Sequence, residues 1–241
     1  MPHFLARRHI LRIAATLPMA ALGARAFAAA APLKIGFIGA GRMATGLGKA
    51  WAKAGHEVMF SSRHPETLKD LVAATGPKAR AGTVKESVAF GDIIVLTVPY
   101  AAVPDIAAEF SKQIAAKQLV IDVSNPIERR DGEIADKILT EGPAEYLTRL
   151  IPGIKLARAF NAIGFNTLDN PPRPEGGPQG VAVVANDPKV IALTEQLVRE
   201  VGFEPVIVGP LSKGKYLYGT YGKFGGVLTP TQVREIGKTL P

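Results

Sequence analysis

The chain has 241 residues, a formal net charge of +8, a pI near 9.7 and no cysteine, which excludes disulfides, thiolate metal sites and a cysteine nucleophile. Four arginines and no acid lie within residues 1–30, so removing this segment takes the charge from +8 to +4. The other Lys and Arg residues are not clustered as on a face that follows a phosphate backbone, so the charge does not indicate a nucleic-acid partner.

Residues 1–30 have the three parts of an export signal. A basic start at Arg7, Arg8 and Arg12 precedes an apolar stretch that ends in small residues at 26–28. The arginine pair also fits the twin-arginine pattern. A membrane anchor is the competing interpretation, but arginines interrupt the stretch and leave less than the ~20 apolar residues needed to span a bilayer. We therefore predict a cleavable twin-arginine signal, export to the periplasm, and contact with a membrane only in transit.

Apolar runs alternate with helical patterns from residue 33 onward. The alternation is typical of βαβ units, and continuous Ile, Val and Leu runs are typical of a parallel sheet covered on both faces. The sequence predicts one α/β domain at 31–211 with a doubly wound, mostly parallel sheet. Strands are expected at 33–39, 56–62, 92–99, 118–126, 154–162, 181–187 and 204–209, and helices at 44–55, 65–76, 101–117, 144–152 and 188–202.

Three stretches depart from this alternation. The helical pattern loosens over 127–143, and 169–180 is rich enough in Pro and Gly to predict a loop. Residues 212–241 form a glycine-rich, basic and aromatic C-terminal tail. The tail could stack on an anionic second ligand, but we favour a surface loop or a subunit contact, which leaves a homodimer open.

The segment after the first predicted strand has the pattern of a dinucleotide-binding loop. Gly39, Gly41 and Ala44 occupy the three positions of G-x-G-x-x-G/A, with a strand before them, a helix after them and a second strand beyond. Gly39 permits the tight turn, Gly41 lets the backbone approach a pyrophosphate, and Ala44 keeps the helix close to the sheet. The helix N-terminus offers N–H groups to the phosphates. A glycine turn without a ligand is the alternative, but the context predicts a Rossmann-type site.

The end of the second predicted strand indicates which dinucleotide is bound. Proteins that bind NAD usually carry Asp or Glu there for the ribose 2′-hydroxyl. This chain has Ser62 and Arg63 instead. A hydroxyl and a permanent positive charge suit the 2′-phosphate of NADP, although a solvated surface arginine is the alternative for Arg63. We therefore predict NADP(H) as the cofactor.

Six segments, in this order along the chain, resemble the coenzyme F420-dependent NADP reductases, whose NADP-binding domain is shared with the N-terminal domain of pyrroline-5-carboxylate reductases. They read IGAGRMATGLGKAWAKAGHEV, SSRHPE, LTVPYAAV, IDVSNP, ARAFNAIG and GFEPVIVGPLSKGKYL. The resemblance implies NADP(H) above the strand ends, with Val98 and Pro99 beside the ribose and nicotinamide and 159–162 near the nicotinamide. It carries the remaining contacts over to Ala40, Gly41, Arg42, Met43, Ser62 and Arg63.

Two asparagines add polar groups to the predicted site. Asn125 and Asn161 follow strands, and doubly wound sheets bind ligands outside the carboxyl ends of their strands. Their amides could donate to the nicotinamide or to a substrate. Asparagine also forms turns after strands, and this alternative stays open.

The sequence indicates no catalytic residue and no metal site. Reduction of a carbonyl or imine usually needs a proton donor, and none of the four histidines falls at the predicted nicotinamide end. Hydride transfer between NADP(H) and a deazaflavin or flavin needs little from protein acids and bases. We therefore expect an NADP-dependent oxidoreductase whose acceptor is coenzyme F420, a flavin or a similar redox molecule. The alternatives are a reductase of a small carbonyl, imine or ferric chelate, and a non-catalytic NADP-binding redox module.

Overall fold

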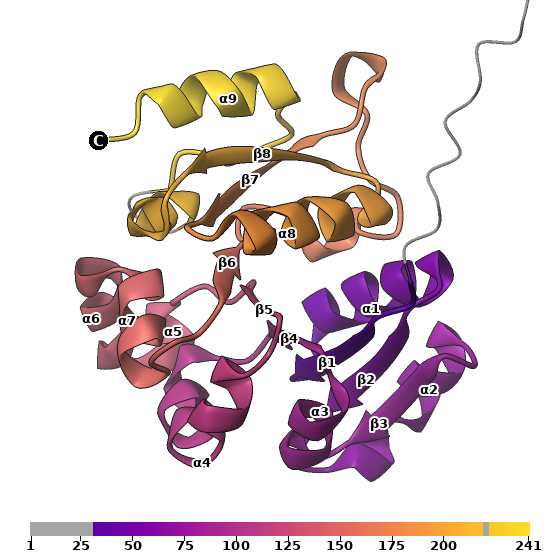
Figure 1. Ribbon diagram of the computed structural model, residues 1–241. Helices are drawn as coiled ribbons and strands as arrows, with labels where there is room; N and C mark the ends of the chain where they lie inside the picture. Colours follow the sequence, from indigo (N-terminus) through magenta and orange to yellow (C-terminus); the bar gives the residue numbers. More distant parts are fainter. Residues whose placement is uncertain (1–30, 219–221) are drawn as a thin grey trace, which may run out of the picture. The chain divides into compact units, whose positions relative to one another are not determined.

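The computed structural model describes residues 31–218 and 222–241, and the predicted signal at 1–30 lies outside them. Residues 32–241 form one compact unit, shown in Figure 1. The strands are β1 (Lys34–Ile38), β2 (Glu57–Ser61), β3 (Ala79–Gly82), β4 (Ile93–Leu96), β5 (Leu119–Asp122), β6 (Leu156–Arg158), β7 (Gly180–Ala185) and β8 (Glu204–Gly209).

Helices lie between most of these strands. The α-helices are α1 (Arg42–Ala54), α2 (Lys69–Thr75), α3 (Val84–Phe90), α4 (Val103–Ala115), α5 (Glu128–Asp131), α6 (Glu133–Glu141), α7 (Pro143–Leu150), α8 (Pro188–Val201) and α9 (Pro230–Lys238). The 3₁₀ segments are η1 (Pro65–Leu68), η2 (Tyr100–Ala102), η3 (Phe165–Thr167), η4 (Pro174–Gly176) and η5 (Leu211–Leu217).

The strands form a single sheet in the order β3-β2-β1-β4-β5-β6-β7-β8. Every neighbouring pair is parallel except β6 and β7, which are antiparallel. The first six strands have the 3-2-1-4-5-6 order of the Rossmann fold, which confirms the predicted fold class. The order reverses between β1 and β4, so their carboxyl ends open the crevice where such sheets bind ligands.

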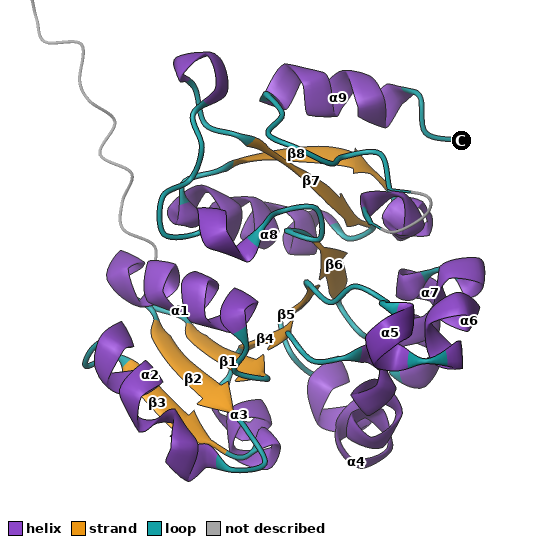
Figure 2. Ribbon diagram, turned by 180° about the vertical axis from the view of Figure 1, so that it is seen from behind, coloured by secondary structure: helices purple, strands orange, loops and turns teal. Residues whose placement is uncertain are grey.

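Helices cover both faces of the sheet, and the side chains of each strand alternate between two apolar cores. On one face, Phe37 of β1 and Val95 of β4 pack with residues of α1 and α8 such as Trp51 and Leu197. On the other face the same two strands pack against α3, α4, α6 and α7. Figure 2 shows the same arrangement from behind. Burial on both faces explains why these strands read as unbroken apolar runs.

Several elements form where no regular pattern was expected. β3 and α3 lie between the second and third predicted strands. α5 and α6 lie within 127–143, where the helical pattern of the sequence is weak. The predicted strand at 154–162 is also shorter than expected. Only Leu156–Arg158 pairs in the sheet, because the backbone turns at Phe160, whose φ is 64°.

The prediction of a C-terminal surface loop is wrong for most of residues 212–241. η5 and α9 pack on β7 and β8 on the face opposite α8, where Val233 and Leu240 join a third apolar cluster with Val206 and Val208. Figure 1 shows β7 and β8 between α8 and α9. These two strands would otherwise expose an apolar face, so the tail completes the fold.

Candidate functional site

The glycine loop connects the end of β1 to the start of α1. Gly39 has a φ of 110°, and a Cβ at this position would lie 2.8 Å from Thr97 Oγ1 on β4's loop. Gly41, the N-cap of α1, has an ordinary φ of −75°, and a Cβ there would meet no atom within 4 Å. Gly39 is therefore required by the protein itself, whereas Gly41 leaves open space at the surface of the loop.

The first turn of α1 faces that open space without a counter-charge. It carries no acidic residue and no side-chain cap, and Gly41 and Arg42 are exposed. The positive end of the helix dipole and its free N–H groups therefore remain available to an anion. Ala40 and Met43 are partly buried beside the loop, and Ala44 is buried against the sheet, as the motif predicts.

The end of β2 approaches this loop through a serine that no sequence motif singled out. Ser61 is buried, and its hydroxyl accepts a hydrogen bond of 3.2 Å from the Gly39 N–H. Ser62 is half-buried and accepts from the His64 N–H at 3.0 Å. Arg63 is exposed and makes no ion pair or hydrogen bond with any residue that the structure describes. Ser61 thus holds the loop, while Arg63 remains able to bind a ligand.

The loop after β4 lies next to the glycine loop, across the reversal of strand order. Thr97 Oγ1 donates to the Ile38 carbonyl at 2.9 Å, which fixes this loop against the end of β1. Val98 is half-buried and Pro99 is exposed at the start of η2. Both predicted residues therefore lie beside the glycine loop at the reversal of strand order.

The structure brings the two predicted asparagines together. Asn125 Nδ2 donates to the Asn161 carbonyl at 2.7 Å, and Asn161 Nδ2 donates to the carbonyls of Asp122 and Ser124 at 3.2 and 3.1 Å. Asn161 is 3% exposed. These bonds join the loops after β5 and β6 rather than forming local turns, and they use both N–H groups of Asn161 within the protein. Asn161 Oδ1 is buried without a partner among the described residues.

The turn that carries Asn161 is held in an uncommon conformation. Phe160 precedes it with a positive φ, although its ring is buried between Trp51 and Phe203 at centroid distances of 6.4 and 6.2 Å. A bulky residue in this region persists only where its surroundings hold it, and such positions concentrate at functional sites. Farther along, the exposed Phe165 ring lies 3.9 Å from the Arg42 guanidinium, so this segment also borders the glycine loop.

A buried polar network that the sequence did not reveal lies beneath the ends of β4, β5 and β6. The Tyr100 hydroxyl donates to Asp122 Oδ2 at 2.6 Å, and Arg158 Nη1 contacts both that hydroxyl and that carboxylate. All three side chains are essentially unexposed. Burial raises the pKa of the Tyr100 hydroxyl well above its usual value, so this hydroxyl stays protonated and acts as a donor.

The described residues offer neither a metal centre nor a membrane-spanning element. Within 31–218 and 222–241, no group of three or more His, Asp or Glu side chains is placed to hold a metal ion. Over the same ranges, no helix combines the length and the apolar character needed to cross a bilayer.

The fold and the glycine loop define a protein of the dinucleotide-binding Rossmann class. Within it, residues 34–126 match the model of the family described as NADP oxidoreductase, coenzyme F420-dependent. The resemblance that the motifs indicated is thereby confirmed, and the chain is related to NADP-dependent oxidoreductases.

Three proteins illustrate the relationship. Metalloreductase STEAP3 of Rattus norvegicus is 26% identical over 185 residues, which are 76% of this chain and 35% of that protein, so the chain spans about a third of its length. The structure of a candidate F420-dependent NADP reductase from Arthrobacter sp. FB24 has a TM-score of 0.67 at 21% identity, covering 76% of this chain and 87% of that chain. A hypothetical protein from Sinorhizobium meliloti has a TM-score of 0.65 at 25% identity, covering 83% and 93%.

Proposed function

We propose that this chain is an oxidoreductase that binds NADP(H) in the crevice between β1 and β4 and exchanges hydride with a deazaflavin, a flavin or a similar acceptor. The observation that carries the proposal is the space beside Gly41, where no protein atom explains the missing side chain. A pyrophosphate that runs close to the backbone would explain it, because a Cβ would occupy its path.

The residues around the crevice fit NADP(H) at its adenosine end. The loop at Gly41 and the first turn of α1 would hold the pyrophosphate with N–H groups, while Ser61 keeps that loop in place. Arg63 would bind the 2′-phosphate, since its guanidinium is exposed and unpaired among the described residues. No carboxylate stands at 61–63 to bind a free ribose 2′-hydroxyl or to repel the phosphate.

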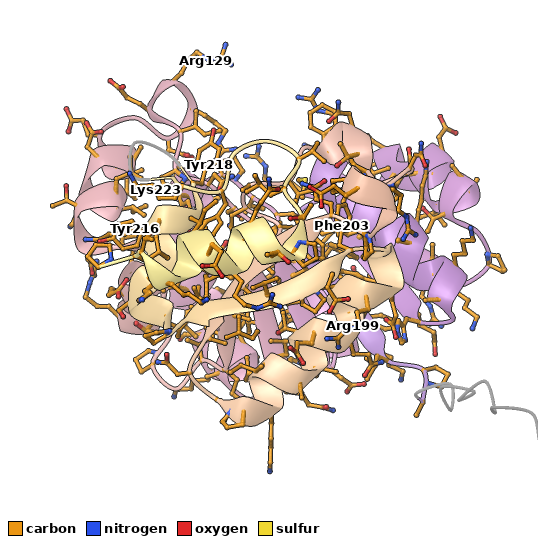
Figure 3. All side chains as sticks on the ribbon, turned by 90° about the horizontal axis from the view of Figure 1, so that it is seen from above. Arg129, Arg199, Phe203, Tyr216, Tyr218 and Lys223 are labelled. Atoms are coloured by element: carbon orange, nitrogen blue, oxygen red, sulfur yellow. The ribbon has the colours of Figure 1, made fainter. Side chains whose placement is uncertain are left out.

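The opposite end of the proposed site borders a segment that suits a planar, anionic acceptor. When bound, NADP(H) supplies or accepts a hydride, and hydride exchange with a deazaflavin or flavin requires little acid-base help. The C-terminal part of the chain near Ala162 carries the aromatic residues Tyr216, Tyr218 and Phe224 and the basic residue Lys223. Phe224 packs near Ala162, and the Lys223 N–H donates to the Tyr216 carbonyl at 2.9 Å. Figure 3 shows Tyr216, Tyr218 and Lys223 gathered on this segment, which suits an aromatic, anionic acceptor.

A ferric chelate is the second candidate acceptor, and the similarity to a metalloreductase favours it. A hydride carries two electrons, whereas each Fe(III) accepts one. Reduction of iron would therefore require a flavin that takes the hydride and passes single electrons to two ferric ions. We expect iron reduction by this chain only when a flavin is added.

The first experiment compares NADPH and NADH binding to the wild type and to Arg63→Ala by calorimetry. A charge-assisted hydrogen bond contributes about 1.5–3 kcal/mol, and the exposed position of Arg63 favours the lower end. We expect Arg63→Ala to weaken NADPH binding about tenfold and to leave NADH binding within about twofold. Arg234→Ala is the matched control, because Arg234 is also exposed and unpaired among the described residues but lies on α9.

The same protein is then assayed for NADPH oxidation with F420, FMN, FAD, a ferric chelate and a cyclic imine. Oxidation with a deazaflavin or flavin supports the proposal, whereas a preference for the imine would identify a different reductase. Tight NADPH binding without turnover of any acceptor would favour a non-catalytic binding module. Equal losses of NADPH and NADH binding in Arg63→Ala would contradict the role of Arg63.

A further inference from the structure

Burying the polar side chains of Tyr100, Asp122 and Arg158 reduces the free energy gained on folding. A buried ion pair pays a desolvation penalty, and apolar side chains of similar volume are often as stable or more stable. The other buried side chains on this part of the sheet are mostly apolar, and buried polar ones such as Ser87 and Thr194 are small and uncharged. A fully buried arginine at the end of β6 therefore needs an explanation other than stability.

The register of the sheet places the three groups at the same edge. Asp122 ends β5, Arg158 ends β6, and the two residues are direct partners in the ladder. Tyr100 starts η2, immediately after the loop that follows β4. The network thus joins three strand ends, and these ends belong to the half of the crevice opposite Ser61 and Arg63.

Further hydrogen bonds extend the network to the residues expected at the nicotinamide. Asp122 Oδ1 accepts from the Ser124 N–H at 2.9 Å, and Ser124 Oγ donates to the Val98 carbonyl at 2.9 Å. The Ser124 carbonyl accepts from Arg158 Nη2 at 3.3 Å and from Asn161 Nδ2 at 3.1 Å. A shift of any member of the network would therefore move Val98 relative to Asn161.

We infer that Tyr100 and Arg158 are positioning residues, which fix the loops after β4, β5 and β6 in the spacing that receives the nicotinamide ring. The inference rests on the proposed NADP(H) site. Neither side chain reaches solvent, so both act through Val98, Asn125 and Asn161 rather than on the ligand. The adenosine end depends on α1, β1 and β2, which no hydrogen bond of the network reaches among the described residues, so we expect it to stay intact when the network is cut.

The test uses Tyr100→Phe, which removes one hydroxyl and keeps the ring in place. Tyr146→Phe is the matched control, because its ring lies 6.1 Å from that of Tyr100 in the same core. The Tyr146 hydroxyl makes no hydrogen bond within 31–218 and 222–241. Calorimetry gives the Kd of NADPH and that of 2′,5′-ADP, which carries the adenosine and 2′-phosphate without the nicotinamide. Their ratio reports how well the nicotinamide end is held.

We expect Tyr100→Phe to weaken NADPH binding at least about fivefold with 2′,5′-ADP binding unchanged, and to lower kcat for hydride transfer about 10-fold to 100-fold. Tyr146→Phe should change neither ligand's Kd. Ser124→Ala, which cuts only the link to Val98 and to Leu96, should show a smaller effect of the same kind, and it decides the matter if Tyr100→Phe does not fold.

An unchanged Kd ratio in Tyr100→Phe and Ser124→Ala would overturn the inference while the proposed function stands, whether neither Kd changes or both ligands weaken equally as in a general loss of structure. A wild-type protein that binds 2′,5′-ADP and NADPH equally would also overturn it, because the nicotinamide end would then contribute nothing. If the wild type binds neither ligand, the proposed function fails and the inference fails with it.

Discussion

Alanine at Gly39 should lower stability, whereas alanine at Gly41 should weaken ligand binding, although the two glycines belong to one loop. At Gly39 the backbone φ of 110° is unfavourable for any residue with a Cβ, which costs about 1–2 kcal/mol. The new methyl would also lie 2.8 Å from Thr97 Oγ1 and 2.9 Å from the Thr97 carbonyl. Because β4 holds that backbone, the overlap adds about 1–3 kcal/mol. We expect Gly39→Ala to lose about 2–5 kcal/mol of unfolding free energy.

Gly41→Ala should leave stability nearly unchanged. Its φ of −75° and ψ of −175° suit alanine, and the methyl would meet no protein atom within 4 Å. The free energy of unfolding should therefore change by no more than about 0.5 kcal/mol, as for most surface substitutions. The methyl would, however, stand in the space proposed for the pyrophosphate, so we expect NADPH binding to weaken at least about tenfold.

Urea denaturation and calorimetry with NADPH measure the two effects separately. Gly177→Ala is the control, because Gly177 also has a negative φ of −99° and a Cβ there would meet only the Pro174 carbonyl, at 4.0 Å. It should change neither stability nor binding. Wild-type NADPH affinity in Gly41→Ala would refute the assignment of the pyrophosphate to this space. Wild-type stability in Gly39→Ala would show that the close contact with Thr97 does not exclude a Cβ.

Two further predictions concern parts of the chain outside the glycine loop. Burial raises the pKa of Asp131, but hydrogen bonds from Arg130 and from the N–H groups of Ile127 and Ala101 outweigh it and hold the pKa below its usual value. The stabilisation is therefore complete above about pH 4 and disappears as the pH falls through the lowered pKa. Asp131→Asn should lower the urea midpoint more at pH 7 than at pH 3; an equal difference at both pH values would contradict this. Val233→Ala, on the buried face of α9, should cost about 2 kcal/mol in urea denaturation, whereas no loss would mean that α9 is dispensable.

The central strands could be predicted from the sequence because both faces of each are buried. β1, β4 and β5 consist of apolar residues with few interruptions, and turn residues mark their ends. β3 gave no such signal, since Ala79–Gly82 is short and exposes Arg80 at the edge of the sheet. Whether this segment joins the sheet depends on the neighbouring strands, which a single sequence does not show.

The missed helices α3 and α9 did leave a local signal. Thr83 and Glu86 form a capping box at the start of α3, and Thr229 and Gln232 form another at the start of α9. The T-x-x-E and T-x-x-Q spacings mark helix starts even where the apolar pattern is weak. What the sequence could not show is the partner of α9, because the apolar face of β7 and β8 becomes visible only when the sheet is assembled.

The two ends of the proposed site also differ in how far they can be predicted from the sequence. The adenosine end is built by contiguous backbone at Gly39–Ala44 and by the residues that end β2, so a spacing rule finds it. The nicotinamide end depends on Tyr100, Asp122 and Arg158, which lie up to 58 residues apart and meet only through the strand order. No motif joins them. Substitutions that alter the choice of acceptor can therefore accumulate around this end while the glycine loop stays recognisable, which is consistent with the similarity of this chain to proteins whose names give different acceptors.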